Sequence, residues 1–210
     1  MPIIQTPEIF SQTNADIAIW HIAESEQSLM NMCDNIGVDL DGIQQMRTAK
    51  RRIEALCEQL LLHHLLKCTH VVFHLPSGAP YIENLHRNIS ISHTKQYVAV
   101  ALCNDNIGID IEQHTPKVLG VRSRFLSNKE REDIAETNVE LNVAAWTAKE
   151  ALYKAIGVSG IDFANDPAID AKAIASHCHH YACHYHEREF LATTHSDNDY
   201  TMTLVSEKQK

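Results

Sequence analysis

IGIDIE, residues 107–112, alternates apolar and polar side chains along its whole length. Because successive side chains of a β-strand point to opposite faces of a sheet, this pattern predicts a strand whose three isoleucines enter a core. The carboxylates of Asp110 and Glu112 then lie side by side on the other face. Like charges this close repel each other unless water or a cation separates them. The face is therefore either the solvated side of a strand or a place for a hard cation such as Mg²⁺.

Strand and helix patterns continue toward the N-terminus. Residues 16–23 alternate well enough for a first strand, and residues 88–94 and 97–103 are short runs rich in β-forming side chains. Between them, residues 41–68 repeat apolar side chains at helical spacing, which predicts one or two helices.

The same order of elements follows toward the C-terminus. Ser127, with Glu130 three residues later, has the pattern of a capping box and predicts a helix start. Residues 139–156 predict a long helix that ends near Gly157. Strand-like runs follow at residues 168–175, 180–189 and 200–206. The order strand, long helix, strands thus occurs twice, with a midpoint near residues 104–106, although no sequence repeat supports the division.

Composition narrows the class of protein. The chain has 210 residues, a net charge of -9 and six cysteines without a CxxC pair. The negative charge argues against general nucleic-acid binding, and scattered cysteines in a chain of this length predict reduced thiols. Because neither a signal peptide nor an apolar run long enough to span a membrane is visible, we expect a cytoplasmic protein without membrane contact.

Two further pairs of side chains carry possible chemistry. Glu150 and Lys154 are four residues apart on the predicted helix, so they share a face, either as a surface ion pair or beside an anion. Ser92 and His93 lie at a predicted strand, where a hydroxyl and an imidazole could bind phosphate oxygens. Ordinary hydrogen bonding at a strand end is the alternative for this second pair.

The succession of these motifs resembles that of the 4'-phosphopantetheinyl transferases, specifically the surfactin-type members of about this length. The resemblance extends over residues 47–163. The motifs that carry it, in order, are GAPYI (78–82), NISISHT (88–94), IGIDIE (107–112), RFLSNKE (124–130) and WTAKEALYKAIG (146–157).

The resemblance implies a reaction and a fold. The 4'-phosphopantetheine arm of coenzyme A would be transferred to a serine of an apo acyl or peptidyl carrier protein, with release of 3',5'-ADP. The implied fold class is α+β, with two similar α/β halves related by a pseudo-twofold axis. Residues 1–105 would contact coenzyme A phosphates, whereas residues 106–210 would hold magnesium and dock the carrier. A monomer is expected, since the short relatives that act as trimers have one such half per chain.

The resemblance also implies roles for particular residues. The implied magnesium ligands are Asp110, Glu112 and Glu150, and the implied contacts to coenzyme A phosphates are Ser92, His93 and Lys154. Attack of the serine oxygen on a phosphorus builds charge on phosphoryl oxygens, which Mg²⁺ and Lys154 would stabilise. Glu150 is the first candidate for the general base, directly or through a water. Lys154 is the second, because it would need a strongly lowered pKa.

The chain departs from the family pattern at two positions. Ala79 stands where a lysine is common, and Gln59 stands where an arginine is common in the first long helix. We expect either weaker binding of coenzyme A or compensation by basic residues of that helix; a solvated basic face is the alternative. These residues are Arg47, Lys50, Arg51 and Arg52.

Two other clusters have open roles. The basic residues between Lys117 and Lys154 would suit an acidic carrier protein, and the role of Glu130 within that stretch stays open. Residues 177–187 are rich in histidine and cysteine, as in some metal sites, but neighbours such as Cys183 and His184 would face opposite sides of a strand. Two alternative functions remain. The departures at Ala79 and Gln59 leave open a coenzyme A-binding relative without catalysis, and the histidine-rich run leaves open a metal-binding protein.

Overall fold

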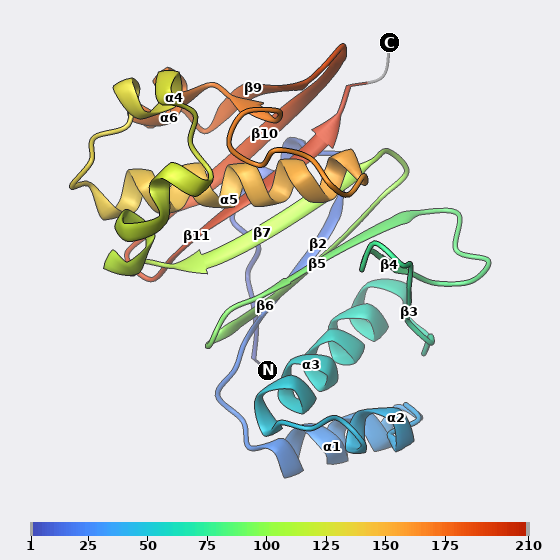
Figure 1. Cartoon of the computed structure of the whole chain (residues 1–210). Helices are drawn as coiled ribbons and strands as arrows, with labels where there is room; N and C mark the ends of the chain where they lie inside the picture. The colour runs from blue at the N-terminus through green and yellow to red at the C-terminus, as the bar shows by residue number, and fades with distance from the viewer. Residues whose placement is uncertain (1, 209–210) are drawn as a thin grey trace.

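The computed structural model describes residues 2–208 and contains two larger antiparallel sheets (Figure 1). The first sheet has the strand order β1-β2-β6-β5, and the second has the order β7-β11-β10-β9-β8. The strands of the first are β1 (Ile3–Ile4), β2 (Asp16–His21), β5 (Asn88–His93) and β6 (Tyr97–Cys103). Those of the second are β7 (Ile107–Gln113), β8 (Ala168–Ile169), β9 (His180–Tyr185), β10 (Arg188–Ser196) and β11 (Tyr200–Glu207). A small ribbon pairs β3 (Phe73–His74) with β4 (Pro80–Tyr81).

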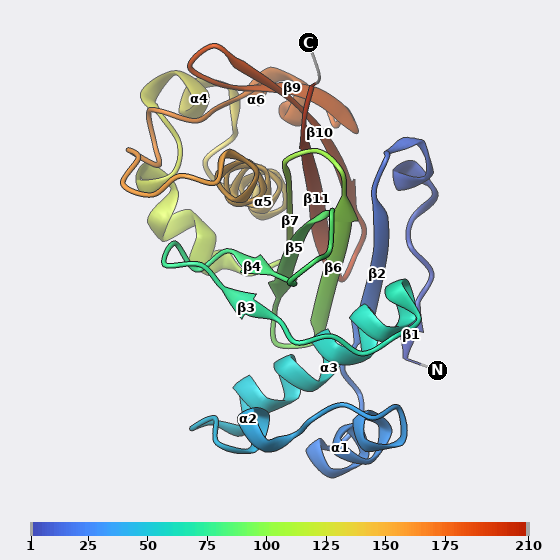
Figure 2. The same cartoon turned by 90° about the vertical axis from the view of Figure 1, so that its right-hand side faces the viewer.

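Each larger sheet carries one long helix on its outer face. The helix α3 (Ala49–Leu66) packs on β2 and β6, with α1 (Glu26–Asn35) and α2 (Asp41–Gln44) beside it. The helix α5 (Val139–Ile156) packs on β7 and β11, and Figure 2 shows it nearly end-on beside these strands. The shorter helical segments are η1 (Glu8–Gln12), η2 (Pro116–Arg124), α4 (Asn128–Asp133) and α6 (Ala171–Ala175).

Local sequence explains where the long helices begin and end. The Thr48 side chain accepts from Arg51 N at the start of α3, and the Asn138 side chain accepts from Leu141 N at the start of α5. Such caps satisfy backbone donors that have no partner inside the helix. The helix α5 ends at Gly157, whose φ of 71° is the left-handed conformation that glycine adopts without a steric cost.

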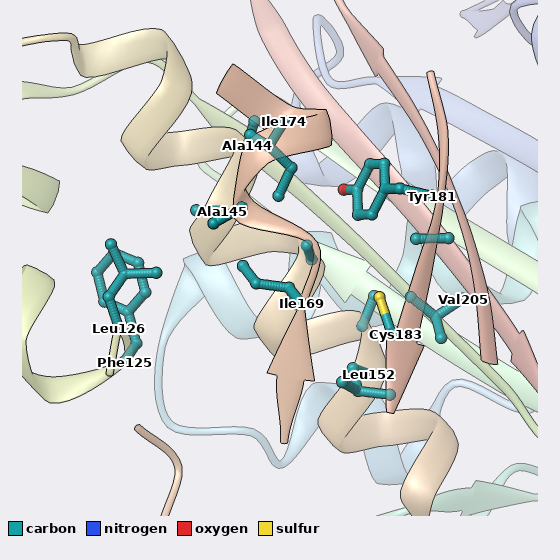
Figure 3. Packing of buried hydrophobic residues seen from close by; sticks show 14 of the residues in the cluster. Phe125, Leu126, Ala144, Ala145, Leu152, Ile169, Ile174, Tyr181, Cys183 and Val205 are labelled. Atoms are coloured by element: carbon teal, nitrogen blue, oxygen red, sulfur yellow. The ribbon is translucent and has the colours of Figure 1, made fainter. Parts of the chain in front are cut away.

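Apolar side chains form three clusters that fix the layers. One cluster lies between α5 and the five-stranded sheet, where Leu152, Cys183 and Phe190 are fully buried (Figure 3). A second lies under α3. The third lies between the inner faces of the two sheets and contains all three isoleucines of the IGIDIE strand. The prediction that these isoleucines enter a core is confirmed.

Side-chain hydroxyls join the two sheets where β5 meets β7, the edge strands of their sheets. Ile109 N donates to Ser90 Oγ at 2.9 Å, and Ile111 N donates to Ser92 Oγ at 3.3 Å. An edge strand presents unpaired backbone groups, and these serines satisfy two of them. The N-terminal sheet is thereby fastened to β7 beside Asp110.

Most of the expected elements are present, with specific corrections. The predicted helix of residues 139–156 and the strands at 16–21, 88–93, 97–103 and 107–113 are confirmed, and Ser127 and Glu130 form the expected capping box. The prediction of a single strand at residues 168–175 is wrong. It divides at Asp170, whose side chain accepts from Ala173 N and starts α6.

The structure also bears on the state of the cysteines and on membrane-spanning helices. All six cysteines are free thiols. Among residues 2–208, no helix combines the length and the apolar character needed to cross a membrane.

Candidate active site

A glycine allows α5 to lie directly against β7. A Cβ atom on Gly108 would be 1.8 Å from the carbonyl oxygen of Ala151 and 2.8 Å from the backbone nitrogen of Ala155. Real Cβ atoms essentially never come so close to another atom. The strand and the helix can therefore approach this closely only with glycine at position 108. This approach carries Glu150 and Lys154 to the side of Asp110.

Asp110 is the centre of the resulting polar cluster. The residue is only 4% exposed, so the alternative of a solvated strand face is wrong for it. Its Oδ1 accepts from Ser92 Oγ at 2.7 Å and from Lys154 Nζ at 2.9 Å. Its Oδ2 is buried and has no hydrogen-bond partner among the residues described. Since a buried carboxylate oxygen without a partner is costly, this oxygen is open to a cation.

Glu112 and Glu150 lie close enough to Asp110 for its negative charge to raise their pKa values. Burial, and then the charge of Asp110, raises the pKa of the Glu112 carboxyl to about 7. The same two causes, in the same order, raise the pKa of the Glu150 carboxyl to about 7. Trp146 Nε1 donates to Glu112 Oε1 at 3.3 Å, which orients that side chain. Three carboxylates thus share a partly desolvated neighbourhood with Lys154 as the nearby cation.

The donor chemistry of this neighbourhood fits a hard divalent cation. All of the acidic donors are oxygens, one of them is unpartnered, and their mutual repulsion is what a cation would relieve. Within residues 2–208, however, no group of three or more His, Cys, Asp or Glu side chains is already arranged to hold a metal ion. The structure therefore places the three predicted ligands near one another without a formed coordination shell.

Ser92 and His93, the predicted phosphate contacts of β5, have different surroundings. Ser92 is buried, and its hydroxyl proton is donated to Asp110. His93 is exposed, and its Nε2 lies 2.9 Å from Nη1 of Arg51, which comes from α3. Two predicted phosphate contacts that are 42 positions apart in the sequence are therefore neighbours in space.

The basic residues of α3 and its approach divide into different environments. Arg52 forms a two-bond ion pair with Glu26 of α1, at 2.6 and 3.2 Å, and donates to Met46 O. Its guanidinium thus ties α1 to α3. Lys50 Nζ lies 3.5 Å from Glu54, and Arg47 is exposed before the helix begins.

A cavity of about 410 Å³ opens beside Arg51. Gln59, where the family commonly has arginine, also lines it, together with Glu58 and the segment at residues 69–72. Ala79, the other departure, lies in the turn between β3 and β4, where its carbonyl accepts from Leu75 N at 2.9 Å. Arg51 is therefore the basic residue that borders both this cavity and His93.

Glu130 and Lys149 form a buried pair that sequence patterns did not reveal. Lys149 Nζ lies 2.9 Å from Glu130 Oε2 and also donates to the carbonyls of Ala164 and Pro167. The other oxygen of Glu130 accepts from Ile169 N at 3.0 Å. The side chain of Lys149 is fully buried, so the expectation that it contributes to a basic docking surface is wrong. The pair instead fastens α4 and the loop after α5 to α5 itself.

A Lys149→Met variant is expected to lower the free energy of unfolding by about 3–5 kcal/mol, because it leaves Glu130 as a buried charge without its counterion. Urea denaturation followed by circular dichroism measures this change. A Glu130→Gln/Lys149→Met double variant should recover part of the loss, because no isolated charge then remains. A single variant as stable as the wild type would show that the pair does not hold these segments together.

The histidine-rich segment forms an ordinary strand and its flanking turns. Along β9, Tyr181 and Cys183 are buried, whereas His180 and His184 are exposed. His177, in the turn after α6, and His186, directly after β9, have positive φ values of 54° and 52°. The alternation separates Cys183 from its histidine neighbours, as expected from the sequence.

Comparisons with known proteins match the part of the chain that contains the carboxylate cluster. Residues 106–205 match the family described as the 4'-phosphopantetheinyl transferase superfamily. A 4'-phosphopantetheinyl transferase of Bacillus subtilis is 26% identical over 134 residues, which cover 61% of this chain and 59% of that protein. A second from Bacillus subtilis is 34% identical over 38% of each chain, and one from Bacillus pumilus is 28% identical over 51% of each chain.

The chain thus spans between about two fifths and three fifths of the length of these curated relatives. The segment that matches the 4'-phosphopantetheinyl transferase superfamily, residues 106–205, contains β7, α5 and all three carboxylates of the cluster.

Proposed function

We propose that this protein transfers the 4'-phosphopantetheine arm of coenzyme A to a serine of an apo acyl or peptidyl carrier protein, releasing 3',5'-ADP. The observation that carries the proposal is the gathering of Asp110, Glu112, Glu150 and Lys154 where α5 lies against β7. This gathering falls inside the segment that matches the superfamily, and the three relatives above are all named 4'-phosphopantetheinyl transferases.

Asp110, Glu112 and Glu150 would hold Mg²⁺. Bound there, the ion would supply positive charge to a diphosphate as negative charge develops on its oxygens. The unpartnered Oδ2 of Asp110 supports this assignment, because it is buried beside two carboxylates that burial already disfavours as anions.

The surroundings of Lys154 and Glu150 separate their roles. Lys154 Nζ donates to the carbonyl of Ile109 at 2.8 Å and to Asp110 at 2.9 Å, so it acts as a donor in both contacts. A charged ammonium can stabilise phosphoryl oxygens but cannot accept a proton. We therefore assign Lys154 to charge stabilisation and Glu150 to accepting the proton of the carrier serine.

The nucleotide end of coenzyme A would bind at the N-terminal sheet and α3. Arg51 and His93 bring a guanidinium and an imidazole from two elements to one place, and the 410 Å³ cavity opens beside Arg51. Arg51 thereby compensates for the cations absent at Ala79 and Gln59. Arg47 is a possible additional contact of the same type, whereas Ser92 and Arg52 would have to exchange the partners they now have.

The two halves of the chain, each built on one sheet, would bind different parts of the reacting complex. Residues 1–105 would supply the phosphate contacts, and residues 106–210 the magnesium ligands and the carrier-docking surface. If the two-residue strand β1 is set aside, the first strand of each half pairs with the last, and the last pairs with the one before it: β2-β6-β5 and β7-β11-β10. This shared order supports a pseudo-twofold relation between the halves. We further propose that the protein acts as a cytoplasmic monomer.

The test is incubation with apo carrier protein, coenzyme A and Mg²⁺, followed by intact-mass measurement of the carrier. We expect the carrier to gain the mass of one phosphopantetheine, and a chelator of divalent ions to prevent the gain. Binding of coenzyme A without a mass gain would instead indicate a non-catalytic relative. Stoichiometric zinc in untagged protein, again without a gain, would indicate the histidine-rich metal-binding alternative.

A further inference from the structure

A buried carboxylate lies behind the Arg51–His93 pair. Glu54 of α3 is 3% exposed, and its Oε1 is buried without a hydrogen bond to any residue from 2 to 208. Two cationic or potentially cationic groups lie just beyond hydrogen-bond geometry from that oxygen, His93 Nδ1 at 3.4 Å and Lys50 Nζ at 3.5 Å. The other oxygen, Oε2, lies 3.3 Å from Arg51 Nη1. Glu54 therefore contacts both members of the pair from the protein side.

The contact between Arg51 and His93 determines which ring nitrogen carries the proton. A guanidinium has only donors, so a ring nitrogen 2.9 Å from Arg51 Nη1 must be the acceptor. That nitrogen is Nε2, and the proton of the neutral ring is consequently on Nδ1. Nδ1 is the nitrogen that faces Glu54. A carboxylate beside Nδ1 sets the tautomer and the orientation of a histidine ring.

We propose that Glu54 is a positioning residue, which holds the His93 imidazole and the Arg51 guanidinium at the place where a phosphate of coenzyme A binds. This inference rests on the proposed function. Glu54 does not touch the ligand; it acts through His93, whose Nε2 side it keeps directed toward Arg51 and solvent. A phosphate oxygen would replace Nε2 as the acceptor for Arg51. Nε2 itself can donate to that phosphate only in the imidazolium form, in which Nδ1–H still faces Glu54.

The chain offers a matched control on the same helix. Glu58 lies one turn beyond Glu54 and is 6% exposed. Its Oε1 lies 3.4 Å from Arg51 Nη1, and its ion pair is with this arginine. A Glu58→Gln variant therefore removes an equally buried charge from beside Arg51 without removing the contact to His93 Nδ1.

A double-mutant cycle tests whether Glu54 acts through His93. The steady-state constants for coenzyme A are measured for Glu54→Gln, His93→Ala and the double variant, with Glu58→Gln as the control. We expect Glu54→Gln to raise the KM for coenzyme A about tenfold while kcat changes less than about twofold. In the His93→Ala background the same substitution should change KM less than about twofold, because its partner is already absent. Equal effects of Glu54→Gln in the two backgrounds would overturn the proposal. Glu58→Gln, whose side chain lines the same cavity and contacts Arg51 and not His93, should change KM by the same factor with and without His93.

A second measurement uses the wild-type protein and does not depend on the folding of a variant. The ¹⁵N chemical shifts of the His93 ring, assigned by comparison with His93→Ala, report the tautomer of the neutral ring. We expect the proton on Nδ1; a proton on Nε2 would contradict the assigned role of Glu54. Failure of the wild type to modify any carrier would refute the proposed function instead, and the tautomer result would be unaffected by it.

Discussion

A Gly108→Ala variant is expected to lose the folded C-terminal half of the protein. The added methyl group would lie 1.8 Å from the backbone oxygen of Ala151, and a helix backbone cannot rotate away as a side chain can. Relief requires α5 to move off β7, which would open the cluster around Leu152 and Phe190. We expect a loss of more than about 4 kcal/mol, a large part of the stability of an ordinary domain. Urea denaturation followed by circular dichroism measures it.

Gly42→Ala is the matched control for this substitution. Nothing lies within 4 Å of a Cβ at position 42, which is inside the short helix α2. Alanine there should leave stability unchanged or raise it by up to about 1 kcal/mol, since it restricts the unfolded chain. A Gly108→Ala protein with a wild-type denaturation midpoint would show that α5 does not require this close approach.

A Glu150→Gln variant is expected to lose turnover while keeping its fold. Glutamine has nearly the same shape but cannot accept the serine proton, so kcat should fall by about 10²–10³-fold. Stability should be unchanged or higher, because the substitution removes one of the charges that repel Asp110 in a partly desolvated place. The time course of the carrier mass gain and a urea denaturation curve measure the two effects separately.

Glu140→Gln provides the comparison on the same helix. Glu140 lies in the first turn of α5, where a negative charge interacts favourably with the helix dipole. Its substitution should cost a few tenths of a kcal/mol in stability and leave kcat unchanged. Near-normal turnover of Glu150→Gln would exclude Glu150 as the general base.

Periodic patterns in the sequence predicted the elements that carry the site. The alternation in IGIDIE requires only that one face be buried, and the helix of residues 139–156 has a cap at Asn138 and a glycine at its end. Both signals are local, so sequence alone could supply them. The run 168–175 was misread because its alternation of apolar residues outweighed the capping signal of Asp170.

Periodic sequence patterns could not predict the contacts between segments that are far apart in the chain. Adjacent residues on a helix point about 100° apart, and this rotation sends Arg52 to Glu26 and Arg51 to His93. Which arginine faces which partner depends on how α3 packs, and the sequence does not state that. The pairing of Glu130 with Lys149 likewise depends on the placement of α4 against α5. The capping box at Ser127 accounts for one contact of Glu130 Oε2 but predicts neither Lys149, which contacts the same oxygen, nor Ile169 N, which donates to Oε1.

The two serine hydroxyls between β5 and β7 connect the two sheets without backbone pairing. A backbone ladder across this line would pair the two sheets residue by residue, whereas Ser90 and Ser92 contact β7 through three hydrogen bonds of their hydroxyls. A hydroxyl can rotate or exchange its partner for water without unpairing any strand. The contact between the sheets beside Asp110 therefore depends on side-chain hydroxyls, whereas the apolar cluster between the inner faces holds the sheets themselves together.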